Sequence, residues 1–174
     1  MMENGEEAKK HFEKANDYAQ KGDYVNAEKE CREAMSINPN YVEAHAYLGT
    51  LLYALGRYEE AEKEYKEAIK IDSNYTYPYI PLAWLLHSLE RNEEAEEVFR
   101  KLLKIKPDDA EAHLNFGSVL QNLGRNEEAE KEYKEVIRIK PDYALAHLRL
   151  GILYINTGEK RQSKKRNFKG KKVI

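Results

Sequence analysis

The sequence lacks the features of a secreted or membrane-spanning protein. Its one cysteine, Cys31, excludes an internal disulfide and suits a reducing compartment. No apolar run approaches the roughly 18 residues that a membrane-spanning helix requires. The first residues, MMENGEEAKK, are polar and acidic, unlike the apolar segment of a signal peptide. We therefore expect a cytoplasmic protein without a membrane span.

Sequence motifs for catalysis are missing as well. The chain has no phosphate-binding loop, no paired metal-ligand motif and no combination of a nucleophile with a base. Charged residues make up 34% of the chain, but both signs are mixed, as expected for helices with one solvated face. We predict that the protein is not an enzyme and needs no metal or cofactor.

What the sequence has in abundance is repetition. The segment EKEYKEAIKI at residues 62–71 recurs 68 positions later as EKEYKEVIRI at residues 130–139. A shift of 34 residues aligns further positions, which we call columns. The columns are glycine at Gly22, Gly56, Gly124 and Gly158, alanine at Ala27, Ala61, Ala95 and Ala129, isoleucine at Ile37, Ile71, Ile105 and Ile139, and proline at Pro39, Pro107 and Pro141. Glu90 interrupts the glycine column and Ser73 the proline column. A fixed period of this length indicates a stacked helical repeat.

Each repeat has the pattern of two helices joined by a turn. Apolar residues recur at steps of three and four along both halves, which is helical periodicity. Between the halves, the glycine column can adopt the left-handed conformation that ends a helix. The proline column then ends the second helix. The sequence therefore predicts an all-α solenoid of helix–turn–helix hairpins.

The period also sets the expected boundaries along the chain. We expect a disordered N-terminus at residues 1–7, a solenoid over residues 8–160 and a basic tail at residues 161–174. The four full repeats and one partial repeat of the solenoid are 8–41, 42–75, 76–109, 110–143 and 144–160. Lys14 stands where later repeats have a large apolar residue, which suits an N-terminal cap whose outer side meets water.

A column of small residues predicts where the two helices of each hairpin approach most closely. Its members are Ala15, Gly49, Ala83, Gly117 and Gly151. A side chain larger than alanine at these positions would cost on the order of 1–3 kcal/mol by overpacking. The column of Cys31, Tyr65, Phe99 and Tyr133 is expected to supply core residues, so Cys31 is interpreted as a small packing residue rather than a nucleophile.

These glycine, alanine, aromatic and proline columns resemble those of the tetratricopeptide repeat (TPR) family. The resemblance covers roughly residues 8–160 and recurs four and a half times. It implies a right-handed superhelix in which the first helix of each repeat lines a concave groove for partner peptides. It also implies a protein or peptide partner, although it does not identify one.

Four of the five histidines share another column, which raises the question of a metal site. His11, His45, His113 and His147 occupy it, with Tyr79 in the third repeat. Zinc needs ligand nitrogens about 2.0–2.1 Å from the ion, whereas packed helices lie about 8–10 Å apart. We therefore predict a half-buried structural role for these histidines. A weak pH dependence of stability is a secondary hypothesis.

The groove implied by the resemblance has an aromatic centre. Three tyrosines outside the packing columns, Tyr47, Tyr53 and Tyr77, face it together with Trp84. The candidate binding residues are Asn16, Tyr47, Thr50, Tyr53, Tyr77, Ile80, Trp84, His87, Leu114, Asn115, Gln121, Asn122 and Arg149. Aromatic residues with polar tips are enriched at binding hot spots. The alternative is that these side chains pack only against neighbouring first helices.

The C-terminal tail differs from the rest of the chain in charge. Residues 161–174 contain seven basic residues and no acidic one, whereas residues 1–160 contain 22 basic and 31 acidic residues. Such a tail could bind nucleic acid or an anionic surface, or fold back on the acidic helices. A frameshift that replaced a second helix would also explain it. Whichever explanation of the tail holds, we expect the end of the solenoid to lack a covering helix, which suggests self-association there.

The function that these observations favour is a non-catalytic scaffold or adaptor that binds a peptide segment in its groove. One alternative is a nucleic-acid or anionic-surface binder that acts through the basic tail, although we do not expect nucleic acid to be the main partner. The other alternative is a regulatory subunit of a larger complex.

Overall fold

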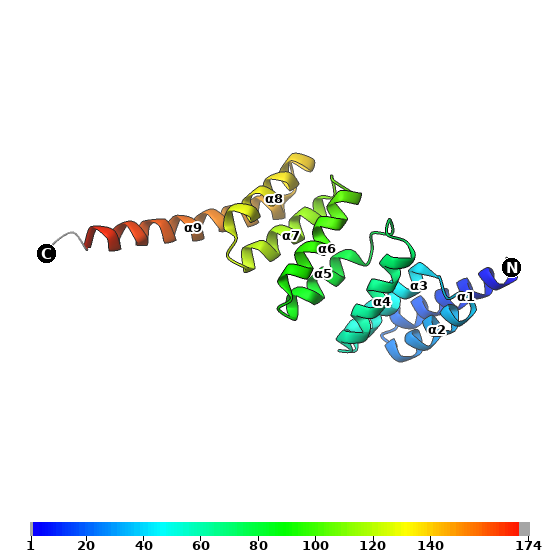
Figure 1. The fold of residues 1–174 in the computed structure, drawn as a ribbon. Coiled ribbons are helices and arrows are strands. Elements are labelled where there is room, and N and C mark those ends of the chain that lie inside the picture. Colours follow the sequence, from blue (N-terminus) through cyan, green and yellow to red (C-terminus); the bar gives the residue numbers. More distant parts are fainter. Residues whose placement is uncertain (1, 171–174) are drawn as a thin grey trace. The chain divides into compact units, whose positions relative to one another are not determined.

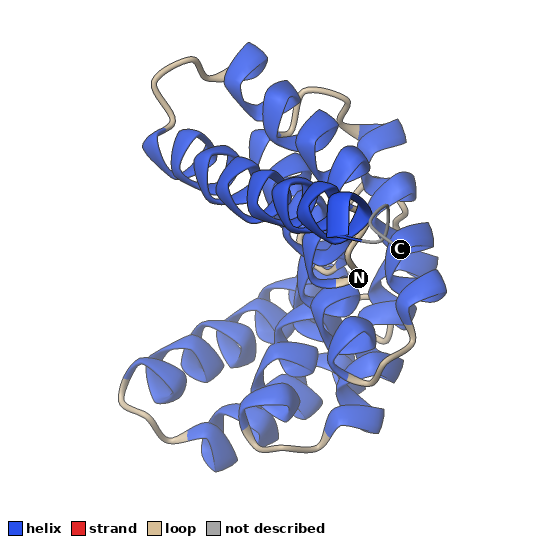
Figure 2. Ribbon diagram, turned by 90° about the vertical axis from the view of Figure 1, so that its left-hand side faces the viewer, coloured by secondary structure: helices blue, strands red, loops and turns tan. Residues whose placement is uncertain are grey.

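The computed structural model describes the backbone of residues 2–170 and the side chains of residues 5–158 (Figures 1 and 2). Within that part the regular elements are all helices. They are α1 (Met2–Gln20), α2 (Tyr24–Ile37), α3 (Val42–Ala54), α4 (Tyr58–Ile71), α5 (Tyr79–Ser88), α6 (Asn92–Ile105), α7 (Ala110–Asn122), α8 (Asn126–Ile139) and α9 (Ala144–Gly170). The prediction of an all-α solenoid of helical hairpins is confirmed.

Consecutive helices pack in pairs, α1 with α2, α3 with α4, α5 with α6 and α7 with α8. Each pair is one repeat of the sequence. The chain forms two compact units, a first unit at residues 1–105 and a second unit at residues 106–174. The core of the first unit contains Ala27, Ala61 and Ala95 of the alanine column together with Leu48, Leu52 and Tyr65, all nearly inaccessible to solvent.

The turn inside each hairpin has a left-handed residue at the position predicted for glycine. Gly22, Gly56 and Gly124 have φ angles of 79°, 76° and 74°. The residue after each glycine reaches back to the preceding helix, as when the N–H of Arg57 donates to the carbonyl of Leu52 at 2.9 Å. Glu90 makes the same turn with a φ of 60°. Since an L-residue is strained there, the third repeat has a less favourable turn than its neighbours.

We expect Glu90→Gly to stabilise the first unit by about 0.5–1 kcal/mol. The left-handed conformation costs a non-glycine residue about 1–2 kcal/mol, and the greater unfolded-state entropy of glycine offsets part of that gain. Urea unfolding of the full chain, followed by the fluorescence of Trp84, measures the change. The reverse change at the matching position, Gly56→Glu, should destabilise. A Glu90→Gly variant that is no more stable than the wild type would contradict this account.

The column of small residues accepts fewer residue types than its sequence suggested. A Cβ atom added to Gly49 would lie 2.7 Å from the ring of Tyr65, and one added to Gly117 would lie 2.7 Å from the ring of Tyr133. Real Cβ atoms do not approach other atoms so closely. Alanine was expected to fit throughout this column. At the two positions that face a tyrosine, glycine is needed.

The two ends of the chain differ from the sequence expectation. Helix α1 begins at Met2, so residues 2–7 are helical in place of the expected disordered segment, and acidic residues in a first helical turn favour this. Helix α9 continues through Gly158 to Gly170 without a turn. Residues 159–170 contain several good helix formers and no proline, so nothing in them ends the helix.

The fifth repeat therefore consists of a first helix alone. A Cβ atom added to Gly151 would meet nothing within 4 Å, whereas the same column is covered in the second and fourth repeats. Apolar side chains of α9 are exposed, with Leu148 at 57% and Ile155 at 62%. The expectation of self-association rests on these side chains and stays a prediction. The tail side chains and residues 171–174 lie outside the described residues, so the proposals for the tail also stay predictions.

Candidate functional site

Aromatic side chains gather on the first helices and the inter-repeat segments of the first unit. The ring of Phe12 on α1 lies 5.3 Å from that of Tyr41 and 5.6 Å from that of Tyr47 on α3. Tyr75 and Tyr77, in the segment before α5, stack with centroids 6.2 Å apart. Tyr77 is 49% exposed and the others are half-buried. We call these five residues the aromatic face.

A set of hydroxyl contacts connects this face to the core. The Tyr65 hydroxyl donates to Thr50 Oγ1 at 3.3 Å, and Thr50 Oγ1 lies 3.4 Å from the Tyr77 hydroxyl. Thr50 thus joins a core tyrosine on α4 to an exposed tyrosine that precedes α5. In the third repeat the matching positions are Trp84 and Phe99, which lack these hydroxyls. These hydroxyl contacts therefore occur at Thr50 and have no counterpart at Trp84.

Other candidates in the first unit lie beside different partners. Tyr53 is 43% exposed, and its ring lies 5.3 Å from that of Tyr58 at the start of α4. Trp84 has its ring 5.7 Å from the ring of His87, whose Nδ1 lies 2.7 Å from Asn92 Oδ1. Tyr53 thus lies at the end of its hairpin, beside the turn between α3 and α4. The sequence analysis had instead grouped it with Tyr47 and Tyr77 in the aromatic centre of the groove. The remaining two candidates, Asn16 and Ile80, are half-buried.

The predicted residues of the second unit have mixed exposure. Leu114 is only 7% exposed, so it mainly packs inside the unit. Gln121 Oε1 accepts a hydrogen bond from the Tyr133 hydroxyl at 2.7 Å, and Asn115 Nδ2 donates to the Glu111 carbonyl at 2.8 Å. Asn122 and Arg149 are exposed. A single groove that includes these residues and the aromatic face stays a prediction.

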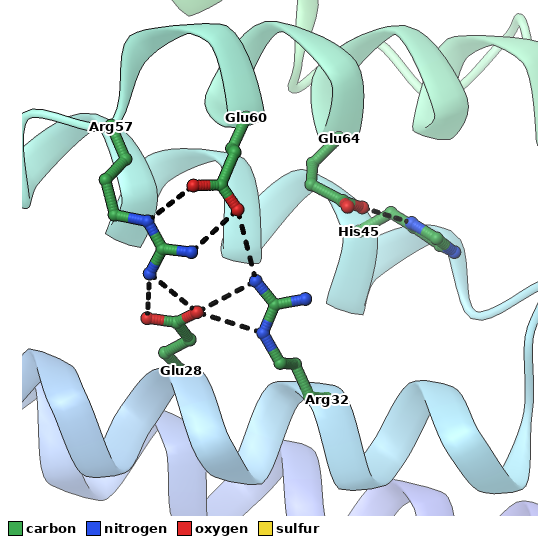
Figure 3. Close-up of polar contacts among 6 residues, drawn as sticks. All are labelled: Glu28, Arg32, His45, Arg57, Glu60 and Glu64. Atoms are coloured by element: carbon green, nitrogen blue, oxygen red, sulfur yellow. Dashed lines mark hydrogen bonds and ion pairs between the residues drawn. The ribbon is translucent and has the colours of Figure 1, made fainter.

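The histidine column forms hydrogen bonds that the sequence did not reveal. His45 Nδ1 lies 2.7 Å from a Glu64 carboxylate oxygen, and its Nε2 lies 2.9 Å from the Pro39 carbonyl oxygen (Figure 3 shows the contact with Glu64). His113 makes the same pair of contacts with Glu132, at 2.6 Å, and with the Pro107 carbonyl, at 2.9 Å. Tyr79 fills this column in the third repeat, and its hydroxyl donates to the Ser73 carbonyl at 2.8 Å.

These contacts favour the protonated form of both rings. A neutral imidazole carries one N–H, so only the imidazolium can donate to both oxygens at once. Burial by itself lowers the pKa of His45, but the hydrogen bonds to Glu64 and the Pro39 carbonyl outweigh it, and the pKa is raised. The hydrogen bond to Glu132 raises the pKa of His113 against the opposing effect of burial. His45 and His113 are thus buried and hydrogen-bonded, a more polar environment than packing alone, whereas His147 is exposed and does not have the predicted half-buried position.

Two other expectations concerned metal binding and Cys31. Over the described side chains, no three His, Cys, Asp or Glu residues come together as ligands for one ion. Cys31 is fully buried, and burial raises the pKa of its thiol to about 12. The thiol therefore stays protonated near neutral pH, which agrees with the interpretation of Cys31 as a packing residue.

Ion pairs link the second helices of successive repeats (Figure 3). Arg57 donates to both carboxylate oxygens of Glu28 at 2.8 and 2.7 Å and also to Glu60. Arg91, 34 residues later, does the same with Glu62 and Glu94. The hydrogen bonds from Arg91 hold the pKa of Glu62 below its ordinary value. Sequence reasoning missed this network, although the shared period of its members was a signal.

Comparisons with known proteins agree with these repeats. A sequence profile described as "Tetratricopeptide repeat" matches residues 18–79, and one described as "TPR repeat" matches residues 83–124 and 117–158. The chain belongs to the tetratricopeptide repeat family. The repeats make this TPR protein a protein-interaction scaffold, the general role of a fold that is usually non-catalytic.

Solved TPR structures share the fold at low sequence identity. MamA from Desulfovibrio magneticus RS-1 has a TM-score of 0.76 at 18% identity, covering 94% of this chain and 92% of MamA. A tetratricopeptide repeat protein from Parabacteroides merdae ATCC 43184 has a TM-score of 0.80 at 24% identity, covering 92% and 64% of the two chains. YrrB, described as a TPR protein with an unusual peptide-binding site, has a TM-score of 0.70 at 22% identity, covering 90% and 81%.

Two further findings concern curated relatives and membrane-spanning helices. No curated protein matches the sequence of this TPR protein. In the part of the chain that the structure describes, no helix has the length and apolar character that crossing a membrane requires.

Proposed function

We propose that this TPR protein is a non-catalytic adaptor that holds an extended or helical segment of a partner protein against its aromatic face. The observation that carries the proposal is the exposure of Tyr77 at 49% beside a cluster of half-buried rings on neighbouring first helices. Large apolar surface left in contact with water is costly unless a partner covers it.

The chemistry of the face suits a peptide better than a small molecule. Its rings supply broad apolar contact, and the hydroxyls of Thr50 and Tyr77 can exchange hydrogen bonds with a peptide backbone. Tyrosine and tryptophan lose little conformational entropy on binding, which is why they dominate binding hot spots. YrrB, with the same fold, is described as having a peptide-binding site, and this likeness supports the proposal by analogy.

We expect alanine at Tyr47 of the aromatic face, together with alanine at Trp84, which occupies the position of Thr50 in the next repeat, to lower partner binding about tenfold, a loss of about 1.4 kcal/mol. The double variant and the wild type would be used to capture partners from lysate of the source cells, with recovered proteins quantified by mass spectrometry. The matched control is the double variant with phenylalanine at both positions, which keeps a ring at each and should retain more binding.

The proposal would fail if the alanine variant, shown by circular dichroism to be folded, captured every partner as well as the wild type. Catalytic activity plays no part in this function, and neither does a metal or a cofactor. The proposal includes a cytoplasmic location, which the capture experiment does not test.

A further inference from the structure

One carboxylate stands out among the side chains around the aromatic face. Helix α3 carries Glu43 as its only lysine, arginine, aspartate or glutamate, and helix α5 carries none. Glu43 lies in the first turn of α3 and is exposed. Within the described side chains, no lysine or arginine pairs with it. Its charge is therefore available to a cation that the described side chains do not supply.

Glu43 lies on the face of α3 that also carries Tyr47 and Thr50, because residues four and seven positions apart share one side of a helix. Tyr41 is the residue immediately before α3. Its pKa is raised by burial and then by the carboxylates of Glu43 and Glu13. Tyr75 has its pKa raised by burial and then by Glu43. Glu43 thus lies within electrostatic reach of tyrosines on both sides, and Tyr77 stacks on Tyr75 with an angle of 29° between the rings.

The combination of ring faces with a carboxylate selects for positive charge. The face of a tyrosine ring attracts a cation, and arginine in particular stacks flat on such rings while it donates to a carboxylate. An acidic side chain at the same place would meet the charges of Glu43 and Glu13. A cation is therefore the partner group that fits.

The charge of the whole first unit acts in the same direction. Residues 1–105 contain 14 basic and 21 acidic residues, a net charge of −7. Many of the basic side chains already pair with carboxylates on the second helices, as Arg57 and Arg91 do. A negative field of this kind steers basic partners toward the unit and repels acidic ones.

We propose that the partner segment carries a lysine or arginine side chain, which lies against Tyr41, Tyr75 and Tyr77 with its charge beside Glu43. This inference rests on the proposed function and names the chemistry of the segment that the aromatic face binds. Apolar residues of the same segment then cover Tyr47 and the neighbouring rings.

Selected peptides provide the test. Random 12-residue peptides displayed on phage would be selected on the immobilised full chain, and the recovered sequences should be enriched in arginine and lysine over the starting library. The tightest binder would be synthesised with a fluorescent label, both as selected and with its arginine replaced by citrulline, which has the same shape without the charge. Fluorescence anisotropy then measures each affinity.

On the wild type we expect citrulline to weaken binding about fivefold. On Glu43→Gln the original peptide should bind about fivefold more weakly, and citrulline should then change affinity less than about twofold, because the two groups act as a pair. The matched control is Glu59→Gln, which neutralises another exposed carboxylate in a first turn, that of α4, and should leave affinity unchanged.

The outcomes separate this inference from the proposed function. Binders that lack basic residues, or an equal effect of citrulline on the wild type and on Glu43→Gln, would overturn the cation site and leave the peptide-binding face intact. Peptides that bind the Tyr47/Trp84 alanine variant as tightly as the wild type would instead overturn the proposed function itself.

Discussion

Gly49→Ala should destabilise the first unit by about 3 kcal/mol, the upper end of the usual cost of overpacking. The new Cβ atom would lie 2.7 Å from two atoms of the Tyr65 ring. That ring has little room to move, because Tyr65 is 1% exposed and its hydroxyl is bound to Thr50. The two helices of the second repeat must therefore separate. Urea unfolding followed by Trp84 fluorescence measures the loss.

The chain itself offers a matched control for this substitution. Gly151 belongs to the same column, but none of the described side chains covers it, so Gly151→Ala should stabilise helix α9 by up to about 1 kcal/mol. The third repeat shows a compatible pair, Ala83 with Phe99, so adding Tyr65→Phe to Gly49→Ala should cost less than the sum of the two single changes. A Gly49→Ala variant as stable as the wild type would refute the close-contact argument.

Raising the pH from 6 to 9 should lower the free energy of unfolding, by about 2 kcal/mol in total from His45 and His113. Both pKa values are raised in the folded protein. The stabilisation from each protonated ring is therefore complete below the unfolded pKa of about 6.5 and is lost as the pH rises through the folded pKa. A hydrogen bond to a charged group exceeds a neutral one by about 1 kcal/mol.

The groups around each ring support this direction. Glu64 and Glu67 on α4 act on His45, and Glu132 and Glu135 on α8 act on His113. Each of these carboxylates raises the pKa of the histidine that it faces, so all four act in the same direction.

Substituting tyrosine for His45 and His113 removes the positive charge of each ring and keeps a side chain that can donate to the same carbonyl. Tyr79 shows that a tyrosine in this column still reaches the carbonyl six residues earlier, at 2.8 Å. The His45→Tyr, His113→Tyr double variant should thus keep the carbonyl contacts and lose the pH slope. His147→Tyr is the control, because His147 is exposed and contacts the Pro141 carbonyl. An unchanged slope in the double variant would show that these rings do not govern the pH dependence.

Much of the fold could be predicted because it depends on residues close in sequence. The turn at Gly56 follows from the need for a left-handed residue after α3, and the same reasoning identified Glu90 as the exception. The burial of Ala27, Ala61 and Tyr65 follows from helical spacing alone. These features repeat every 34 residues, so each repeat supports the interpretation of the others.

The candidate site was only partly predictable. Tyr47 and Tyr77 were identified because they fall outside the packing columns, yet the placement of Tyr53 beside Tyr58 depends on how the side chain turns at the end of α3. His45 on α3 pairs with Glu64 on α4, 19 positions later in the sequence. The sequence shows no reason to prefer Glu64 over the other glutamates of α4. Surface glutamates are too common for spacing to reveal which one is paired.

The sequence by itself determined the repeat, the hairpins, the turns and the family, because each depends on local periodicity and on backbone preferences of glycine and proline. The tertiary structure alone decided that Gly49 and Gly117 face tyrosine rings, that two histidines lie between a carboxylate and a carbonyl, and that Thr50 joins the hydroxyls of Tyr65 and Tyr77. Those properties depend on distances of a few ångströms between side chains on different helices. No spacing along the chain specifies such distances.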